Sequence, residues 1–304
     1  MRLSLMNGYW TEIEQHLCKA LDKPVSFVKR ETISGGCINQ TWKVVDKNNN
    51  EYFVKTNSPD LKDMFVAEAK GLEEIENSNS ILTPDVLVFG STSHCSYLVL
   101  EYLSLKSQIN QKRMGEQLAQ MHLYSNPSKK YSNQFGWEHG NHIGSTPQTN
   151  SYNTSWVSFW KNERLLYQLN LAKSKGYSHK AYDDGLKLAD SVGLFFTSHQ
   201  VDTSLLHGDL WGGNCASDVE GNPVIYDPAV YYGDREADIA MTELFGGFNS
   251  DFYKAYNAHF RLDSGYKTRK TLYNLYHILN HFNLFGDSYA FQAESMTKQL
   301  LSEI

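Results

Sequence analysis

The segment HGDLWGGN, residues 207–214, concentrates polar chemistry in a stretch with few bulky side chains. Asp209 is followed five positions later by Asn214, and Asp227 ends the apolar run VIYD thirteen positions further on. Phosphoryl transfer from Mg-ATP requires a carboxylate that orients a hydroxyl and two oxygen ligands that hold a hard cation. The spacing therefore predicts a kinase catalytic loop, with Asp209 as the base and with Asn214 and Asp227 as Mg²⁺ ligands.

The same segment has a simpler alternative, a glycine-rich turn after a buried strand in which the polar residues only cap the turn. In the catalytic interpretation, Gly212 and Gly213 let the backbone turn tightly enough for Asp209 and Asn214 to face one space. His207 is expected to brace the backbone by hydrogen bonding rather than to titrate during catalysis.

The first hundred residues supply a second, independent pair of charges. In the run EYFVKTN, Lys55 shares a strand face with Phe53, so its ammonium points where an apolar side chain points. Thirteen residues later, Glu68 falls within the apolar stripe of a predicted helix, where an unpaired carboxylate is costly to bury. We therefore expect Lys55 and Glu68 to pair beside phosphates, the alternative for Lys55 being a lysine that extends over the surface.

A glycine-rich hairpin, SGGC at residues 34–37, precedes Lys55. Its Gly35 and Gly36 are expected to bring main-chain N–H groups close to the phosphates of a nucleotide. Cys37 would feel the same N–H dipoles, which favour its thiolate, so we expect oxidation sensitivity; an inert thiol is the alternative.

The segment EYLSLKS, residues 101–107, is expected to be a hinge between two lobes. Main-chain groups of Glu101 and Leu103 are expected to bind the adenine of ATP. Either Leu100 or Tyr102 is expected to flank the adenine ring. The cleft between the lobes is the expected active site.

Apolar periodicity predicts an α+β protein with two lobes. The predicted strands lie at residues 25–33, 38–46, 51–57, 85–90 and 96–103. The predicted helices lie at residues 10–21 and 59–75, then at 108–124, 154–174, 180–198 and in several segments after 236. Thr11 and Glu14 have capping-box spacing, and Ser58 with Pro59 is expected to begin the second helix. Residues 1–103 are expected to form a sheet lobe that covers the nucleotide, and residues 104–304 a helical lobe with the catalytic loop and the acceptor site.

Composition disfavours a nucleic-acid partner, a zinc site and a disulfide framework. A formal net charge of −6 and a pI near 6.0 disfavour a broad basic surface for nucleic acid, so a small-molecule partner is expected. The four cysteines contain no C-x-x-C pair, which disfavours a zinc site or a disulfide framework. His139 and His142 are expected to be ordinary loop histidines, with metal ligation as the alternative.

No apolar run approaches the roughly 20 residues that span a bilayer, so no membrane association is expected. The N-terminal residues lack the apolar core of a signal peptide, and a cytoplasmic location is expected. The oligomeric state is left open between a monomer and a weak dimer.

Four segments together resemble the fructosamine kinase (ketosamine 3-kinase) family: SGGCINQ, FVK, HGDLWGGN and DPAVYYGDREADIAMTELFGGF. The resemblance covers about residues 10–290 and implies a bilobal, protein-kinase-like fold similar to that of aminoglycoside and choline phosphotransferases. It also implies ATP- and Mg²⁺-dependent phosphorylation of the 3-hydroxyl of sugar amines that are free or protein-linked. The phosphorylated adduct then decomposes, so the implied role is deglycation.

The resemblance also implies roles for single residues. Trp211 matches the family motif and is expected to stack on a sugar ring, with packing between loop and helix as the alternative. Arg235 and Asp238 are expected to brace the catalytic loop, and Glu236 is expected to be structural as well. The segment FGWEHGNHIGSTPQTN, residues 135–150, is expected to line the sugar pocket.

Two other functions remain open from the sequence. One is a kinase of a different small hydroxyl compound, such as an aminoglycoside, choline or another sugar. The other is a nucleotide-binding module without catalysis. A protein-serine kinase is disfavoured, because Asp227 is followed by Pro-Ala rather than Phe-Gly and no activation segment ending in Ala-Pro-Glu follows.

Overall fold

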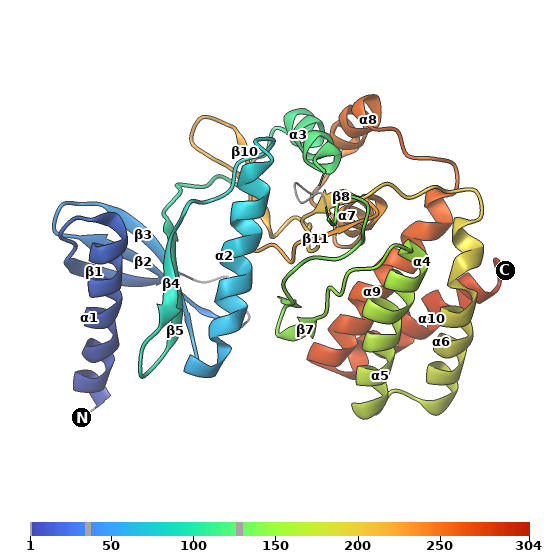
Figure 1. Ribbon diagram of the computed structural model, residues 1–304, viewed down its shortest axis with the longest axis horizontal. Coiled ribbons are helices and arrows are strands. Elements are labelled where there is room, and N and C mark those ends of the chain that lie inside the picture. Colours follow the sequence, from blue (N-terminus) through green and yellow to red (C-terminus); the bar gives the residue numbers. More distant parts are fainter. Residues whose placement is uncertain (1, 34–37, 126–129) are drawn as a thin grey trace.

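The computed structural model describes residues 2–33, 38–125 and 130–304, without the side chains of residues 2–7. Gly35, Gly36 and Cys37 therefore lie outside the described residues. A sheet-rich part formed by the first hundred residues stands beside a larger helical part, and helix α2 lies between the sheet and the helices (Figure 1).

The first part is built on one antiparallel sheet of five strands in the order β1-β2-β3-β5-β4. Its strands are β1 (Phe27–Ile33), β2 (Gln40–Asp46), β3 (Glu51–Asn57), β4 (Val86–Ser91) and β5 (Ser96–Glu101). All five predicted strands are thus confirmed. Lys55 lies on β3 opposite Thr41 of β2 and Leu98 of β5, in the interior of the sheet.

Two helices cover the two faces of this sheet, α1 (Arg2–Leu21) and α2 (Lys62–Asn77) (Figure 1). The alternation of side chains along β5 explains this arrangement. Val99 packs in a core with Ile13 of α1, whereas Leu98 packs in a separate core with Phe65 of α2.

Of the two predicted helix starts, the first is wrong, and the second is right in position but begins with a 3-10 turn. Helix α1 already begins at Arg2, so Thr11 and Glu14 lie inside it, and Glu14 Oε1 accepts a hydrogen bond from the N–H of Phe27 at 2.7 Å. A 3-10 turn over Pro59–Leu61 precedes α2, and Ser58 makes no side-chain capping bond.

The second part is mainly helical. Its α-helices are α3 (Gln111–Leu123), α4 (Trp156–Phe159), α5 (Tyr167–Ser174), α6 (His179–Ser191), α7 (Glu236–Leu244), α8 (Ser250–His259), α9 (Tyr266–Phe285) and α10 (Ala290–Leu301). A π-helix over Trp160–Leu166 joins α4 to α5. Helix α9 is buried around most of its circumference, at polar positions such as Asn274 and Asn280 as well as at apolar ones, and its neighbours include α5, α7 and α10.

Three short strand pairs interrupt the helices: β6 (Asn141–Ile143) with β7 (Thr146–Gln148), β8 (Ser204–Leu206) with β11 (Tyr231–Gly233), and β9 (Cys215–Ser217) with β10 (Pro223–Ile225). The last two pairs frame the segment that contains HGDLWGGN. The chain therefore enters and leaves this segment along strands whose ends are fixed by pairing.

The two parts share main-chain and side-chain hydrogen bonds. The N–H of Ile225 donates to Leu82 O at 3.0 Å. Tyr232 donates from its hydroxyl to Glu74 of α2 at 2.5 Å. These bonds fix α2 against the strands that carry the candidate catalytic residues.

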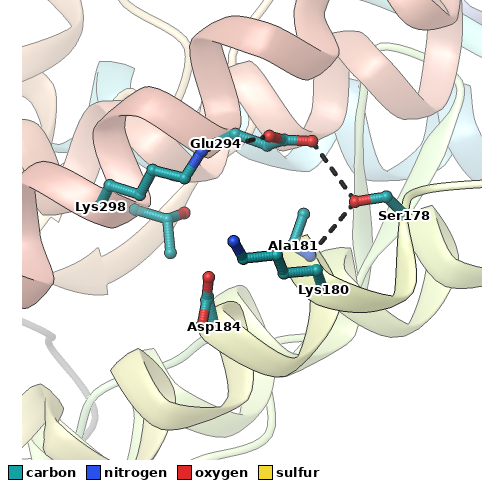
Figure 2. A pocket seen from close by; sticks show the side chains of 7 residues that line it. Ser178, Lys180, Ala181, Asp184, Glu294 and Lys298 are labelled. Carbon is teal, nitrogen blue, oxygen red and sulfur yellow. Dashed lines mark hydrogen bonds and ion pairs between the residues drawn. The ribbon is translucent and has the colours of Figure 1, made fainter.

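A small cavity lies between α6 and α10 (Figure 2). Its volume of about 30 Å³ is close to the share of one water in the liquid. Ser178 donates to Glu294 Oε1 at 3.4 Å across one side of it. This cavity is therefore of solvent size and far too small for a metabolite.

Among the described residues, no helix is both long and apolar enough to cross a membrane.

We predict that Gly115→Ala lowers the free energy of unfolding by about 1–3 kcal/mol, as measured by urea denaturation. A Cβ atom at Gly115 of α3 would lie 2.3 Å from the main-chain oxygen of Phe252 in α8, so the two helices would have to separate. The control is Gly193→Ala, because a Cβ there would lie 3.7 Å from its nearest neighbour, Val157. This control should range from no change to a gain of about 1 kcal/mol. Equal effects of the two substitutions would contradict the prediction.

Candidate active site

The loop between β8 and β9 holds Asp209 and Asn214 side by side. The Asn214 amide donates from Nδ2 to Asp209 O at 2.9 Å and to Asp209 Oδ2 at 3.1 Å. The two donations orient the amide, which leaves Asn214 Oδ1 available to another partner. The sequence prediction that these two side chains face one space is thus confirmed.

A buried carboxylate on α7 fixes the start of this loop. Asp238 accepts the N–H of His207 on Oδ2 at 2.7 Å and the N–H of Gly208 on Oδ1 at 2.9 Å. His122 Nε2 lies 3.2 Å from Asp238 Oδ2. Although burial by itself would raise the pKa of Asp238, these donors hold it below its usual value. Asp238 therefore braces the catalytic loop directly, as expected.

The expected role of Arg235 needs correction, because Arg235 reaches the loop only through other side chains. It donates to the Tyr256 hydroxyl at 3.2 Å, and that hydroxyl lies 2.7 Å from His122 Nδ1. His122 in turn contacts Asp238. Burial lowers the pKa of His122, so a neutral ring that accepts at Nδ1 and donates at Nε2 completes the chain of bonds.

His207 braces the backbone, as predicted from the sequence. Its Nε2 donates to Tyr226 O at 3.0 Å, and its Nδ1 accepts the N–H of Asp209 at 3.3 Å. Burial lowers the pKa of this imidazole, which keeps it neutral in this arrangement. His207 thereby ties the loop to the segment that leads into Asp227.

The glycines of the loop serve close packing. Gly208 has φ +79°, and a Cβ there would lie 2.1 Å from Ala229 O. Gly212 and Gly213 are the central residues of the tight turn predicted for them, closed by the bond from Asn214 N–H to Trp211 O at 2.9 Å, although neither has a positive φ. A Cβ at Gly212 would lie 3.1 Å from Gly246 O, and one at Gly213 would lie 2.3 Å from the Trp211 ring.

The ion pair predicted from the sequence forms, and a third residue joins it. Lys55 Nζ lies 2.6 Å from Glu68 Oε1 and 2.5 Å from Asp227 Oδ1. Burial alone would lower the pKa of Lys55, but the carboxylates of Asp227 and Glu68 raise it above its usual value. The lysine is therefore a permanent buried cation, and the surface alternative for it is excluded.

Asp227 takes an uncommon backbone conformation beside the catalytic loop. Its φ is +58°, in the left-handed region that Asp tolerates better than most residues. The flanking residues are bonded to the loop, since Tyr226 N–H donates to Asn214 O at 3.1 Å and Ala229 N–H donates to His207 O at 2.8 Å. The Asp227 side chain is 47% exposed, so part of its carboxylate faces outward.

The pKa of the Asp209 carboxyl is shifted by burial and by neighbouring side chains. Burial and the nearby Asp227 carboxylate raise its pKa to about 7, although the Asn214 amide opposes this shift. Two carboxylates that repel each other beside an amide oxygen form the oxygen-rich donor set that hard divalent cations prefer. The residues Asp209, Asn214 and Asp227 therefore fit a bound Mg²⁺.

The expected hinge residues lie at the end of β5. The N–H of Glu101 donates to Asp85 O at 2.9 Å, so this donor is already used. Leu100 is buried in the core shared with α2, whereas Tyr102 is half-buried with its ring 4.0 Å from the ammonium of Lys43. The Leu103 side chain is also half-buried. Their contacts to a nucleotide remain predictions.

Trp211 has an intermediate environment. Its ring is 39% exposed and meets Phe245 edge to face, with 6.2 Å between the ring centroids. The ring therefore packs against Phe245 and Gly213 and is still partly exposed. Both the stacking role and the packing role expected from the sequence are compatible with this position.

A buried amide network fixes the segment of residues 135–150, and sequence reasoning missed it. Arg164 of the π-helix donates to Thr149 O at 2.6 Å and to Asn150 Oδ1 at 2.7 Å. Tyr276 of α9 donates to Gln148 Oε1 at 2.6 Å. Gln148 Nε2 in turn donates to Ala229 O at 3.2 Å, next to the catalytic loop. The β6–β7 hairpin is thus held rigidly beside the site.

One sequence signal could have revealed this network. Arg164 is fully buried at a position between Trp160 and Leu165, both of which are core residues. A charge within an apolar stripe requires a buried partner, which is the argument that found Glu68. The partners of Arg164 lie on a different element, so the pairing itself carries no local signature.

A second acidic cluster is structural. Asp234, Glu236 and Asp263 surround His199, whose Nε2 lies 2.8 Å from Asp234 Oδ2 and whose Nδ1 lies 2.5 Å from Asp263 Oδ2. Arg269 of α9 donates to both oxygens of Glu236 at 2.7 and 2.9 Å. The carboxylates of this cluster are therefore paired with the side chains of His199 and Arg269, and Glu236 is structural as expected.

His139 and His142 have different neighbours. His139 Nε2 lies 2.9 Å from Lys70 Nζ, and His142 Nδ1 is buried without a hydrogen-bond partner among the residues that the structure describes. The neighbourhood of a lysine ammonium disfavours a cation at His139. His139 therefore agrees with the expectation of an ordinary loop residue, whereas His142 lies on strand β6 rather than in a loop.

Comparison with known proteins places this geometry in a family. The fructosamine kinase family model matches residues 9–303. A Synechocystis protein named "Probable ketoamine kinase" is 44% identical over 96% of this chain and 97% of its own length. A chloroplastic protein-ribulosamine 3-kinase of Arabidopsis thaliana is 38% identical over 92% of this chain and 84% of its own length.

Solved structures agree with the sequence relatives. A candidate fructosamine-3-kinase from Haemophilus somnus has a TM-score of 0.86 at 32% identity, with coverage of 96% of this chain and 97% of that one. An amicoumacin kinase in complex with AMP-PNP and Ca²⁺ has a TM-score of 0.56 at 13% identity, with coverage of 92% and 88%. The second similarity concerns the fold alone. The predicted α+β, protein-kinase-like fold is confirmed.

We predict that Asp238→Asn lowers the free energy of unfolding by about 1–3 kcal/mol, because an amide cannot accept from His207 N–H and Gly208 N–H on both of its heteroatoms. The same two amide protons should exchange with solvent faster than in the unmodified protein, as measured by hydrogen exchange. The control is Glu243→Gln on the same helix, whose bonds to Tyr266 and Lys270 lie at the surface. It should change stability by less than about 0.5 kcal/mol. Unaltered exchange at 207 and 208 in the Asn variant would refute the bracing role.

Proposed function

The chain belongs to the fructosamine kinase family, and from this premise we propose how it acts as a kinase of ketosamines. It transfers the γ-phosphoryl group of ATP to the 3-hydroxyl of the sugar moiety, and the resulting phosphate ester destabilises the sugar–amine adduct, which serves deglycation. The single observation that carries the residue assignment is the contact of the buried Lys55 ammonium with Glu68 and Asp227 beside the Asp209–Asn214 loop.

Asp209 is the proposed catalytic base. It takes the proton of the acceptor hydroxyl as the hydroxyl oxygen forms a bond to the γ-phosphorus and the bond to the leaving ADP breaks. Asn214 holds the Asp209 carboxylate through the 3.1 Å bond to Oδ2, which leaves the other oxygen for the hydroxyl. The brace by Asp238 keeps the loop backbone fixed during this proton transfer.

Lys55 is the proposed phosphate-binding cation, and Glu68 positions it. The 2.5 Å contact to Asp227 shows how near the ammonium lies to the proposed ligand residues. Because Lys55 is buried, its charge is screened less by water than that of a surface lysine. Its ammonium can therefore neutralise phosphate oxygens effectively once a nucleotide enters.

Asn214 and Asp227 are the proposed ligands of Mg²⁺. Their oxygens form a donor set that favours a hard cation. Burial and the Asp227 carboxylate raise the pKa of Asp209, which indicates a concentration of negative charge that a cation would offset. When bound, the ion offsets the charge that accumulates on the phosphates. Gly35 and Gly36 are proposed to cover the phosphates, and main-chain groups of Glu101 and Leu103 to bind the adenine.

Trp211 and the β6–β7 hairpin are proposed to form the sugar pocket. Trp211 lies two residues from Asp209 and is partly exposed, and the hairpin is held beside the loop through Gln148 and Ala229. Protein-linked ribulosamines are proposed substrates together with fructosamines, since a relative carries the name protein-ribulosamine 3-kinase. We also propose residues 1–103 and 104–304 as the two lobes, and a cytoplasmic location.

We predict that Asp209→Asn lowers kcat by about 10²- to 10⁴-fold while ATP binding stays within about threefold, as measured by ADP release and by calorimetry. The substitution also removes the repulsion between Asp209 and Asp227, so the free energy of unfolding should not fall. The control is Asp190→Asn, the same change at an exposed ion pair with Lys161. A near-normal kcat in the Asp209 variant would exclude the assigned base.

A panel of acceptors tests the substrate class. We expect ADP release with fructosyl and ribulosyl amines to exceed that with free fructose, choline or an aminoglycoside by at least about 100-fold in kcat/KM. Free fructose lacks the amine, choline lacks the sugar, and an aminoglycoside does not carry its amine on a ketose. The measurement is coupled-assay turnover at equal ATP and Mg²⁺. Equal turnover of choline or an aminoglycoside would place the chain with a different acceptor, and turnover of none would favour a non-catalytic module.

A further inference from the structure

An exposed array of aromatic rings extends from the catalytic loop to the end of α9. We call it the aromatic ridge, and its members are Trp211, Phe245, His281, Phe285 and Tyr289. Neighbouring ring centroids are 6.2 Å apart for the first pair, 4.9 Å for the second, 5.6 Å between His281 and Phe285, and 5.0 Å between His281 and Tyr289. Rings at such spacing form one continuous surface.

The ridge is open to solvent at its large apolar members. Phe245 is 42% exposed and Phe285 is 55% exposed. Neighbouring exposed aromatic rings of this kind commonly mark a binding surface. Because Trp211 belongs to the loop of Asp209, the ridge begins at the proposed sugar pocket and leads away from it.

The ridge carries no positive charge of its own. His281 is its one titratable ring besides tyrosine, and burial lowers the pKa of that imidazole. Its Nδ1 lies 2.8 Å from His277 O, which assigns the ring proton to Nδ1 in the neutral form. A neutral array of π faces attracts cations and apolar groups and does not repel an ammonium.

The end of the ridge on α9 also lies near the β6–β7 hairpin. The turn of the β6–β7 hairpin contacts α9 next to Phe285, since a Cβ atom at Gly144 would lie 2.9 Å from Leu284 Cδ1 and 3.3 Å from Ile38 Cδ1. Ile38 directly follows the glycine-rich segment of residues 34–37. The turn of the hairpin, the end of α9 that carries Phe285 and the segment before β2 therefore lie next to one another.

We propose that Phe245, Phe285 and Tyr289 form a subsite for the substituent on the ketosamine amine, outside the sugar pocket. This proposal rests on the proposed function. A ketosamine nitrogen is a secondary amine that is protonated near neutral pH, and it connects the sugar to an alkyl or aryl chain. With the sugar at Trp211, the ammonium and its chain continue along the ridge, where π faces bind both. The ridge thus favours acceptors whose amine bears an apolar chain, such as the side-chain methylenes of a glycated lysine.

The test compares two acceptors that share one sugar, fructosyl methylamine and fructosyl benzylamine. In the unmodified protein, kcat/KM for the benzyl compound should exceed that for the methyl compound by about fivefold or more. Phe285→Ala and Tyr289→Ala should each lower this ratio by about 2- to 10-fold, whereas Phe285→Tyr should retain it. Phe291→Ala, which removes an apolar side chain that is 83% exposed on α10 and outside the ridge, should leave the ratio as it is.

The outcomes separate the subsite from the reaction. A ratio near one in the unmodified protein, or a ratio that neither alanine variant changes, overturns the subsite while ketosamine kinase activity stands. Absence of turnover with both compounds overturns the proposed function and the subsite with it. Because Phe285 is more than half exposed, its truncation does not open the core, and a matching thermal unfolding midpoint checks this directly.

Discussion

A buried ammonium between two carboxylates is the contact on which the rest of the active site depends. Lys55, Glu68 and Asp227 come from β3, from α2 and from the segment after β10, so their contact fixes three separately folded pieces at one point. Loss of the Lys55 ammonium would leave the Glu68 carboxylate buried and uncompensated, which typically costs about 3–5 kcal/mol. Helix α2 is further held by Glu74 on Tyr232 and by Gly71, whose missing Cβ lets Val230 approach. The fold thus builds the position of Glu68 into its core.

Asp238 fixes the backbone at the start of the catalytic loop. A loop that must present Asp209 and Asn214 cannot pair its first N–H groups in a sheet, and a buried unpaired N–H group is costly. The carboxylate on α7 accepts two of them, and its own burial is balanced by His122 and by the chain of bonds that continues to Tyr256 and Arg235. Most of the polar groups around the reactive residues therefore serve to hold the backbone, which leaves few side chains free for the substrate.

The sequence predicted what depends on local periodicity. Alternation located the five strands of the sheet, and a charge inside an apolar stripe located Glu68 and its partner. Sequence patterns did not predict the features that depend on contacts between distant segments. Glu14 is engaged by the N–H of Phe27 rather than by a helix cap, the three-residue strands β6 and β7 are too short for a periodic signal, and Arg164 finds its partners on the segment before α4. The third carboxylate of the lysine cluster, Asp227, was predicted as a metal ligand but not as an ion-pair partner, because 172 residues separate the two.

The composition of HGDLWGGN follows from the number of backbones that converge on it. Ala229 approaches Gly208, and the 246–247 segment approaches Gly212, at distances that exclude a Cβ atom or crowd it severely. Asp238 and Tyr226 occupy the space around His207, so that position needs a neutral hydrogen-bonding ring. Only the side facing the cleft has room, and there the loop presents Asp209, Asn214 and one large apolar side chain, Trp211. Polar chemistry and small residues occur together in this stretch because the same packing that immobilises the reactive groups removes the space for other side chains.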